Sequence, residues 1–384
     1  MEPVKKFRHP PRRSKWVGAL RIARMKLGQW RRGSSQPAPV GRPDYYKREL
    51  HPTLLVRGTS SLPVRSFLPE DHTEPPVMDV ARKCRDSLGV YPLNFSFPRP
   101  ERMPDGLTDR PHFLSSTIPG EPFSFSDWDA YLEEYQSAHF ALSTKKGGWD
   151  TFRHLEILFS GAIPLMPGLA KAHPFALSHY PKRALVSVYQ DLVDNGPAVP
   201  DQPTREFFIR YANEHLTSAA MAQYFLDATG TDPTRALFID RSLATQADYL
   251  SAFSFIGLKQ VLGDHMEAAF EPAYLFDDYP DDTAKLYGKG FGYSLSLPAS
   301  LRSKESLPLD ASIAEVVERS EDCDTIVIGN YDGNRELAAG LLEAGIPPPR
   351  IICILGSDLP PDGRLLREIR ASGMTFFVRE FGSF

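Results

Sequence analysis

The chain has 384 residues, which is long for one compact domain and sufficient for two. Hydrophobic residues make up 42% and charged residues 24%, both ordinary for a globular protein, so wholesale disorder and fibrous repeats are excluded. The formal net charge is −4, but residues 1–42 hold 12 of the 44 Lys and Arg residues and one of the 48 acidic residues, so the remainder is acidic. An acidic body argues against nucleic acid as a partner.

The basic segment at the start of the chain predicts a short amphipathic helix. Within residues 14–32, large apolar residues recur at alternating spacings of four and three, and basic residues surround them. These apolar positions are Trp16, Leu20, Ala23, Leu27 and Trp30. Such a helix binds an anionic membrane surface peripherally, with an organelle transit peptide and a disordered basic tail as the alternatives. Residues 33–43, rich in Ser, Pro and Gly, predict a linker that completes a leader over residues 1–43.

Membrane-spanning and secreted classes are not expected. No apolar run approaches the roughly 18 residues that a spanning helix needs, and the first residues lack the apolar core of a signal peptide. The three cysteines, Cys84, Cys323 and Cys353, are too scattered for a disulfide framework or a thiolate zinc site. We therefore expect a cytoplasmic protein, with membrane association if the basic helix binds lipid.

Residues 44–230 predict a first α/β lobe. The order strand, loop, helix, strand is typical of a parallel sheet. A long helix, with Phe207, Tyr211, His215 and Ala219 at four-residue steps, closes the lobe. The predicted elements are a helix at Val77–Leu88, strands at Tyr91–Phe97, from His112 and from Phe140, a helix from Asp127 to Gln136, a helix over Thr151–Ser160 with Asp150 as its N-cap, and a short strand after Gly161.

Residues 231–384 predict a second lobe of the same type, because strands and helices alternate throughout. Parallel strands need crossover helices, so a Rossmann-like layered fold is expected. The predicted elements are strands at Ala236–Asp240, Thr325–Gly329, Arg350–Leu355 and Thr375–Arg379, and helices at Thr245–Leu262, Ile313–Arg319, Glu336–Glu343 and Leu365–Ala371.

The segment from Phe140 to Pro167 carries the residues best suited to a sugar nucleotide. A diphosphate favours cations, backbone N–H groups and a helix N-terminus, and ribose hydroxyls favour a carboxylate. Arg153 and Glu156 lie one helical turn apart just after a glycine-bearing loop. The phosphate-side residues predicted in that loop are Lys145, Lys146, Gly147 and Gly148. A solvated Arg–Glu helix pair after an ordinary turn is the alternative.

The run Ser137 to Pro167, with its Gly-rich loop, W-D-T-x-R-x-x-E and G-A-I-P-L, resembles the nucleotide-sugar-binding motif of exostosin-like glycosyltransferases and related GT-B enzymes. The resemblance implies that Arg153 and Glu156 bind the donor, with Gly148, Asp150 and Thr151 in the phosphate-side loop. Thr144 departs from the motif, since many members have Pro there. For the fold, the resemblance implies two Rossmann-like lobes in a GT-B-like arrangement.

The second lobe resembles the half of those enzymes that ordinarily comes first. ALFID, DTIVIGNYDGN and RIICILGSD carry this likeness. YYKREL at Tyr45–Leu50 and FFVREF at Phe376–Phe381 both resemble the junction between the lobes, which predicts a circular permutation; a chance match of six residues is the alternative. The permuted order would leave contacts between lobes intact, because such contacts need not follow connectivity.

The resemblance implies a metal-independent glycosyltransferase, a hexosyl- or pentosyltransferase that moves a sugar from a nucleotide-sugar donor to a glycan or other hydroxyl acceptor. No cofactor is expected, since the nucleotide sugar is a substrate. The Asp-x-Asp pairs at Asp127 and Asp322 do not predict a metal site, because the first suits a helix cap and the second precedes a strand. Asp248, in the first turn of a predicted helix, is a candidate catalytic base or a helix cap. The rival is a non-catalytic module that binds a nucleotide or a glycan.

Overall fold

The computed structural model describes residues 50–382 apart from residues 57, 101–109, 118–124 and 126. The chain divides into two compact units, Met1–Val40 and Gly41–Phe384, and the described residues all belong to the second. The predicted amphipathic helix within residues 14–32 lies outside the described residues, as does the YYKREL segment except for Leu50.

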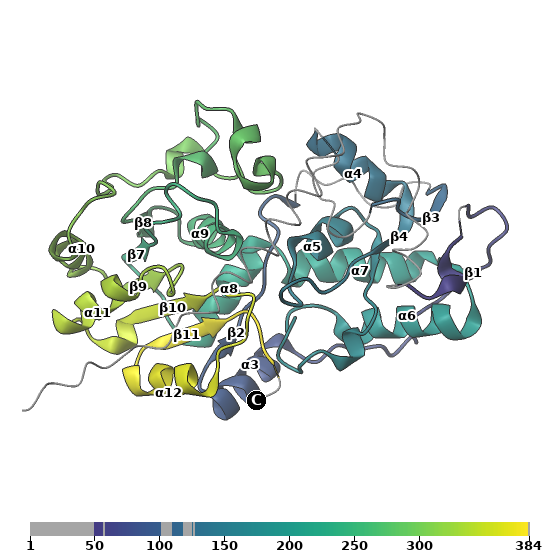
Figure 1. Ribbon diagram of the computed structural model, residues 1–384, viewed down its shortest axis with the longest axis horizontal. Helices are drawn as coiled ribbons and strands as arrows, with labels where there is room; N and C mark the ends of the chain where they lie inside the picture. The colour runs from purple at the N-terminus through teal and green to yellow at the C-terminus, as the bar shows by residue number, and fades with distance from the viewer. Residues whose placement is uncertain (1–49, 57, 101–109, 118–124, 126, 383–384) are drawn as a thin grey trace, which may run out of the picture. The chain divides into compact units, whose positions relative to one another are not determined.

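A six-stranded parallel sheet forms the larger of the sheets (Figure 1). Its strands are β2 (Tyr91–Pro92), β7 (Ala236–Ile239), β8 (Met266–Ala268), β9 (Thr325–Ile328), β10 (Ile351–Leu355) and β11 (Thr375–Val378), in the spatial order β2-β11-β10-β9-β7-β8. Counted from β7, the last five strands stand in the order 2-1-3-4-5, which is a doubly wound arrangement with its switch point between β7 and β9. The predicted α/β class with parallel sheets is therefore confirmed.

Both faces of this sheet are buried, and successive residues of each strand alternate between them. In β10, Ile351, Cys353 and Leu355 pack into one apolar cluster, and Ile352 and Ile354 pack into another. The first cluster also holds residues of α10 (Ile313–Ser320), α11 (Arg335–Glu343) and α12 (Gly363–Ser372), and the second holds residues of α8 (Ser218–Thr229) and α9 (Tyr249–Leu262). Helices thus cover the two faces, as continuous apolar strands require.

A second, three-stranded parallel sheet has the order β3-β4-β5. The strands are β3 (His112–Leu114), β4 (Ala138–Leu142) and β5 (Ile163–Leu165); α4 (Trp128–Gln136) connects the first two and α5 (Phe152–Phe159) connects the last two. Two further helices, α6 (Lys182–Asn195) and α7 (Gln202–His215), belong to the same stretch of chain, and β1 (Val64–Arg65) pairs in parallel with β6 (Val199–Pro200). This pattern places α5 after the loop that leaves the carboxyl end of β4.

Short 3-10 helices occupy several of the connections. They span Pro52–Leu54, Leu169–Lys171, Gly263–His265, Ala273–Leu275, Thr283–Lys285, Tyr287–Gly290, Ala299–Leu301 and Pro348–Arg350. The segment around Tyr287 is unusual because Gly288 and Lys289 both adopt left-handed backbone angles, with φ of 58° and 59°. That conformation is uncommon for a residue with a Cβ atom such as Lys289.

Several elements of the predicted first lobe pack on the six-stranded sheet. Strand β2 pairs with β11, the last strand of the chain, and is shorter than the predicted strand Tyr91–Phe97. Helix α3 (Val77–Leu88) precedes it and ends at the left-handed Gly89. Phe225 of α8 stacks on Phe377 of β11 with ring centroids 4.4 Å apart. The predicted lobe boundary at residue 230 stays a prediction, but contacts cross it.

The single long helix expected through Ala219 is instead two helices, α7 and α8. Leu216 and Thr217 separate them, because the Leu216 carbonyl accepts from Phe97 N and Ser218 N donates to the Phe97 carbonyl. The Thr217 side chain then caps α8 by accepting from Ala220 N at 3.1 Å. The apolar period continues across this break, so the sequence pattern alone predicted one helix.

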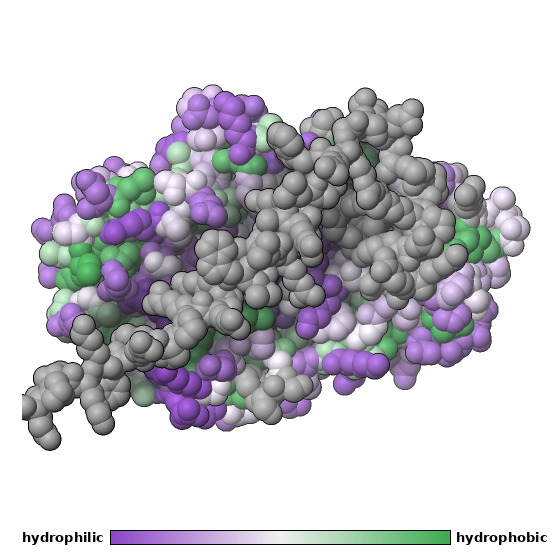
Figure 2. Space-filling view, in the orientation of Figure 1, coloured by the Kyte–Doolittle hydropathy of each residue, from purple (hydrophilic) through white to green (hydrophobic). Residues whose placement is uncertain are grey.

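Hydrophilic and hydrophobic residues are interspersed over the described part of the face shown in Figure 2. Among the described helices, none combines the length and the apolar character needed to cross a bilayer.

Candidate functional site

Helix α5 follows the glycine-bearing loop, and all eight of its residues are buried. Six of them are aromatic, aliphatic or imidazole side chains, but Arg153 and Glu156 are also buried, each only 7% exposed. Charged side chains are rarely buried this far unless they are paired. The solvated Arg–Glu pair that the sequence left open is therefore excluded, and the burial of these two residues needs another explanation.

A pocket of about 210 Å³ lies beside α5. Its lining brings together the loop and α5 with residues that belong to the six-stranded sheet and its connections. From the first group come Lys146, Gly147, Gly148, Asp150, Thr151, Phe152, Arg153 and Glu156, and from the second come Tyr249, Tyr287, Gly288, Phe291, Asp358 and Arg379, with Phe95 and Tyr131 completing the wall. Six of these side chains are aromatic, so cations and carboxylates face an otherwise largely apolar space.

The guanidinium of Arg153 contributes unsatisfied donors to this site. Its Nε and Nη1 are buried and have no hydrogen-bond partner among the described residues. Burial disfavours the charge, but the nearby Tyr135, Tyr131 and Glu156 outweigh burial, and the pKa of Arg153 stays above its ordinary value. A buried donor without a partner costs about 1–3 kcal/mol, so these two nitrogens are unfavourable for the fold, and Arg153 also lines the pocket.

Glu156 is anchored from one side by α4. The hydroxyl of Tyr131 donates to its Oε2 at 2.7 Å, and the hydroxyls of Tyr131 and Tyr135 lie 3.0 Å apart. Burial raises the pKa of Glu156, although the Tyr131 hydrogen bond and the charge of Arg153 act in the opposite direction. Glu156 therefore lies in the pocket as an oriented acceptor.

His154 faces away from Arg153 and holds the loop. Its Nε2 lies 2.7 Å from the Trp149 carbonyl, which can only accept, so Nε2 carries the proton and Nδ1 accepts from the Ser143 hydroxyl at 2.7 Å. Burial lowers the pKa of His154 to about 4, which keeps the ring neutral at pH 7. Both ring nitrogens are then satisfied within the chain, so this histidine has a structural role.

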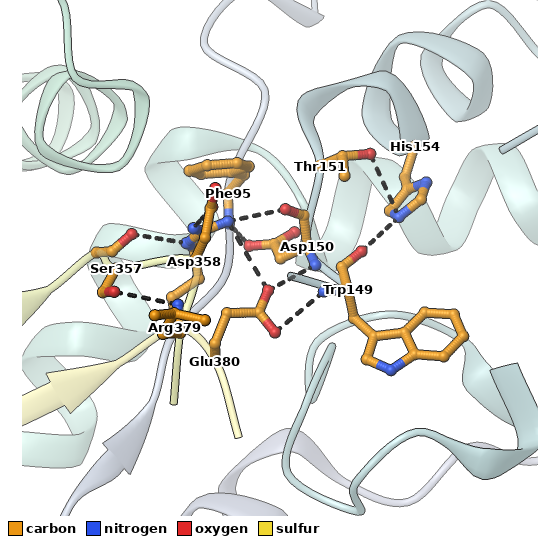
Figure 3. Close-up of polar contacts among 11 residues, drawn as sticks. Phe95, Trp149, Asp150, Thr151, His154, Ser357, Asp358, Arg379 and Glu380 are labelled. Carbon is orange, nitrogen blue, oxygen red and sulfur yellow. Dashed lines mark hydrogen bonds and ion pairs between the residues drawn. The ribbon is translucent and has the colours of Figure 1, made fainter. Parts of the chain in front are cut away.

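Arg379 and Glu380, the two residues that follow β11, contact the same loop (Figure 3). The Glu380 carboxylate accepts from Trp149 N at 3.0 Å and from Asp150 N at 2.8 Å, and Nη1 of Arg379 donates to the Asp150 carbonyl at 2.8 Å. Nη2 of Arg379 also binds Asp358 Oδ1. These two loop amides are therefore already bonded within the chain.

The carboxylates of Asp358 and Glu380 explain why positions 147 and 148 of the loop are glycines. A Cβ atom on Gly148 would lie 2.1 Å from Oε1 of Glu380, and one on Gly147 would lie 2.6 Å from Oδ2 of Asp358. Both distances are far below contact distance, so side chains at these positions would displace the carboxylates. The sequence interpretation, in which the glycines give a phosphate access to the backbone, missed these neighbours.

The side chain of Asp150, in the same loop, is buried. Its Oδ2 accepts from Phe95 N at 2.6 Å, whereas Oδ1 has no hydrogen-bond partner among the described residues. Burial raises the pKa of Asp150 to about 7, and the charge of Arg379 acts in the opposite direction. The sequence predicted Asp150 as the N-cap of the helix, but the structure gives that position to Thr151, whose side chain makes no capping hydrogen bond.

The remaining predicted residues fall in different places. Lys146 lines the pocket, whereas Lys145 is outside the lining and its Nζ lies 6.0 Å from the centroid of the Trp149 ring. Asp248 is the N-cap of α9, where Oδ1 accepts from Ser251 N at 2.9 Å, and the neighbouring Tyr249 lines the pocket in its place. The role of Asp248 as a base stays a prediction.

Sequence reasoning missed four polar residues of the site. Tyr131, Asp358, Arg379 and Glu380 all lie far along the chain from the loop or on another element. The Arg–Glu pair of FFVREF was noticed only as a possible junction. Its position directly after a buried strand was the available signal, because side chains at the carboxyl ends of parallel strands gather at one edge of a sheet.

Over the described ranges, no three His, Cys, Asp or Glu side chains come together as a cluster that could hold a metal ion. Asp127 caps α4 by accepting from Ala130 N at 2.9 Å, as expected, and Asp324 accepts from Thr234 N at 2.8 Å. No protein-family model, curated protein or solved structure matches the chain.

Proposed function

We propose that the chain is a glycosyltransferase that moves a sugar from a nucleotide-sugar donor to a glycan or other hydroxyl acceptor without using a metal ion. The observation that supports this most is the buried side chain of Arg153, which lines a pocket together with Glu156 and has two nitrogens without a hydrogen-bond partner among the described residues. A departing nucleoside diphosphate is the leaving group that such a guanidinium stabilises, and Glu156 accepts from the hydroxyls of the ribose.

The size of the pocket limits what it encloses. Pockets for drug-sized ligands hold about 300–1,000 Å³, and this one holds about 210 Å³. It therefore suits the ribosyl pyrophosphate part of a donor, and the rest of the substrate extends past the exposed Tyr287.

Transfer to a hydroxyl group also needs a base that faces the donor. Asp358 is a carboxylate on the loop after β10; it lines the pocket and its side chain is 67% exposed, so an acceptor can reach it. Asp248 caps α9 instead. The pocket therefore favours Asp358 over Asp248 as the group that takes the acceptor proton.

The finer fold assignment is part of the same proposal. We assign the chain to the exostosin-like GT-B class with its two Rossmann-like lobes in permuted order. The doubly wound strand order of the larger sheet supports this, as does the pairing of β2 with the last strand β11, because a permuted chain would bring its early and late segments together at one sheet edge.

A non-catalytic module that binds a nucleotide or glycan is the second candidate. The observation that favours it is the engagement of Glu380 with the amides of Trp149 and Asp150, which removes two donors from a phosphate. Such a module would bind a nucleotide through Arg153 but would not use Asp358.

Calorimetry and a nucleotide-release assay separate the two candidates. The wild-type protein and the D358N variant are each tested with a panel of UDP, GDP and CMP sugars. In D358N the amide oxygen can still accept a hydrogen bond from Arg379, but the side chain can no longer act as a base. We expect the wild type to bind and turn over one donor class, and D358N to bind it with turnover lowered about 100-fold.

The control is D362N, since Asp362 caps α12 in the same loop and Asn is an equally good cap. D362N should behave as the wild type. A wild-type protein that binds a donor without turnover supports the module, and equal turnover in D358N removes Asp358 from the mechanism.

A further inference from the structure

The loop that precedes α5 is held by residues more than two hundred positions later in the chain. Glu380 is 3% exposed, and each of its carboxylate oxygens accepts from one of two consecutive backbone amides, Oε2 from Trp149 N and Oε1 from Asp150 N. Consecutive amides that converge on one anionic group are the arrangement by which loops bind phosphate. Here the anionic group is a side chain of the same protein.

Arg379 fixes the loop in a second direction. It is 2% exposed, and its guanidinium donates to the Gly356 carbonyl through Nε at 3.1 Å, to the Asp150 carbonyl through Nη1 at 2.8 Å, and to Asp358 through Nη2. Its Cζ also lies 4.5 Å from the centroid of the Phe95 ring. Only a planar fork with several donors can satisfy acceptors on three sides, so Lys cannot replace it.

The same contacts determine which groups remain for a ligand. The amides of Trp149 and Asp150 are bonded to Glu380, whereas Nε and Nη1 of Arg153, three residues after Asp150, are not bonded within the described chain. The two amides are therefore not free to bind an anionic ligand in the pocket, whose lining includes Arg153. The glycine at position 148 permits this, because its missing Cβ leaves room for the Glu380 carboxylate.

We propose that Glu380 and Arg379 are positioning residues, which hold the loop over residues 147–151 and thereby place Arg153, at the start of α5, at the donor pocket. The proposal rests on the proposed function for the identity of the ligand. It adds that the diphosphate is bound by Arg153 in place of the loop amides, and that the end of β11 sets the geometry of the donor site.

A matched control exists in the same protein. Glu74 is another carboxylate that accepts from two consecutive amides, Arg183 N at 3.3 Å and Ala184 N at 2.8 Å, at the beginning of α6 and outside the pocket. E380Q and E74Q each replace one carboxylate oxygen with an NH2 group that cannot accept from an amide. The two variants should lose similar amounts of stability. A difference in their activity would therefore come from the position of Glu380 beside the pocket and not from a general loss of stability.

The first measurement is amide hydrogen exchange of the peptide that covers residues 145–153. We expect exchange of the Trp149 and Asp150 amides to be at least about tenfold faster in E380Q than in the wild type, and unchanged in E74Q. This result does not depend on any ligand. Equal exchange in E380Q and the wild type would overturn the proposal.

The second measurement is the specificity constant for the donor that the panel identifies, taken at a temperature at which all variants are folded. We expect E380Q to lower kcat/KM about 10- to 100-fold, and E74Q to leave it unchanged. Faster exchange in E380Q with an unaltered kcat/KM would contradict the positioning role of Glu380. A wild type that turns over no donor sinks the proposed function instead, and the exchange comparison still decides whether Glu380 holds the loop.

R379K provides an independent probe if E380Q does not fold. It retains the positive charge beside Asp358 but loses the planar fork. We expect the same direction of change in loop exchange and in kcat/KM, and wild-type values in R379K would contradict the role of Arg379.

Discussion

At the scale of single residues, the site is built from buried charges that the fold tolerates at a cost. Arg153 lacks partners for two nitrogens, Asp150 lacks one for Oδ1, and burial raises the pKa of both Asp150 and Glu156. Perturbed ionisable groups of this kind concentrate at functional sites. The loop and α5 therefore contain buried polar atoms without hydrogen-bond partners, and they also line a pocket. This combination is expected of a ligand site.

Asp150 makes the stability of the protein depend on pH. Burial raises its pKa from 3.8 to about 7, so the folded state binds the proton more tightly than the unfolded state. The resulting stabilisation is fully present below about pH 4 and is lost as the pH rises towards and past 7. The change corresponds to about 4 kcal/mol.

D150N should remove this dependence, because Asn is neutral at every pH and its carbonyl oxygen can still accept from Phe95 N. Urea unfolding of both proteins between pH 4 and pH 8 is the measurement. We expect the stability of D150N relative to the wild type to increase by up to about 4 kcal/mol over that range. Parallel curves would show that Asp150 titrates normally.

At the scale of elements, the close approach of α8 and α9 ties the early part of the chain to the larger sheet. A Cβ atom on Gly257 in α9 would lie 2.1 Å from the Ser218 carbonyl oxygen of α8, which is a backbone atom that cannot move cheaply. The helices can pack at this distance only because position 257 has no side chain.

G257A should therefore destabilise the protein by about 2 kcal/mol, despite the better helix propensity of Ala. The control is G363A at the beginning of α12, where the nearest atom to a new Cβ is the flexible end of Arg367 at 3.7 Å. G363A should change stability by less than about 0.5 kcal/mol. Chemical unfolding of the two variants tests this, and equal effects would be inconsistent with the tight α8–α9 contact.

Most elements were predictable because their patterns are local. The strands β7, β9, β10 and β11 are short apolar runs with every residue at least partly buried, and each lies within one residue of its predicted range. The break between α7 and α8 was not predictable, because it depends on hydrogen bonds to Phe97 from a distant segment. The strand at Tyr91 was shorter than expected for the same reason, since its partner β11 limits the pairing to two residues.

At the scale of the whole molecule, the sequence located half of the site. Arg153, Glu156, Gly148, Asp150, Thr151 and Lys146 all line the pocket, as a local motif allowed. The other half comes from distant parts of the chain, among them Asp358 and Arg379, which only the folded topology brings to the loop. A contact such as Glu380 to Trp149 spans 231 positions, and no spacing rule in a single sequence encodes it.

The proposed function requires that Arg153 contributes to ligand binding and not to the stability of the folded protein. Replacing it with Met keeps most of its volume and removes a buried charge whose donors are unpaired, and Glu156, whose pKa burial already raises, can become protonated to offset the loss of the nearby cation. Loss of the guanidinium also removes the group that binds the diphosphate. The variant should therefore separate stability from binding.

The most direct test is calorimetric titration of the wild type and R153M with UDP, GDP and CMP, together with their thermal unfolding midpoints. We predict that the wild type binds one of the three, that R153M binds none, and that R153M unfolds at the same or a higher temperature. If R153M binds a nucleotide as the wild type does, or if it is strongly destabilised while no nucleotide binds the wild type, Arg153 is a structural residue and the proposed donor site is contradicted.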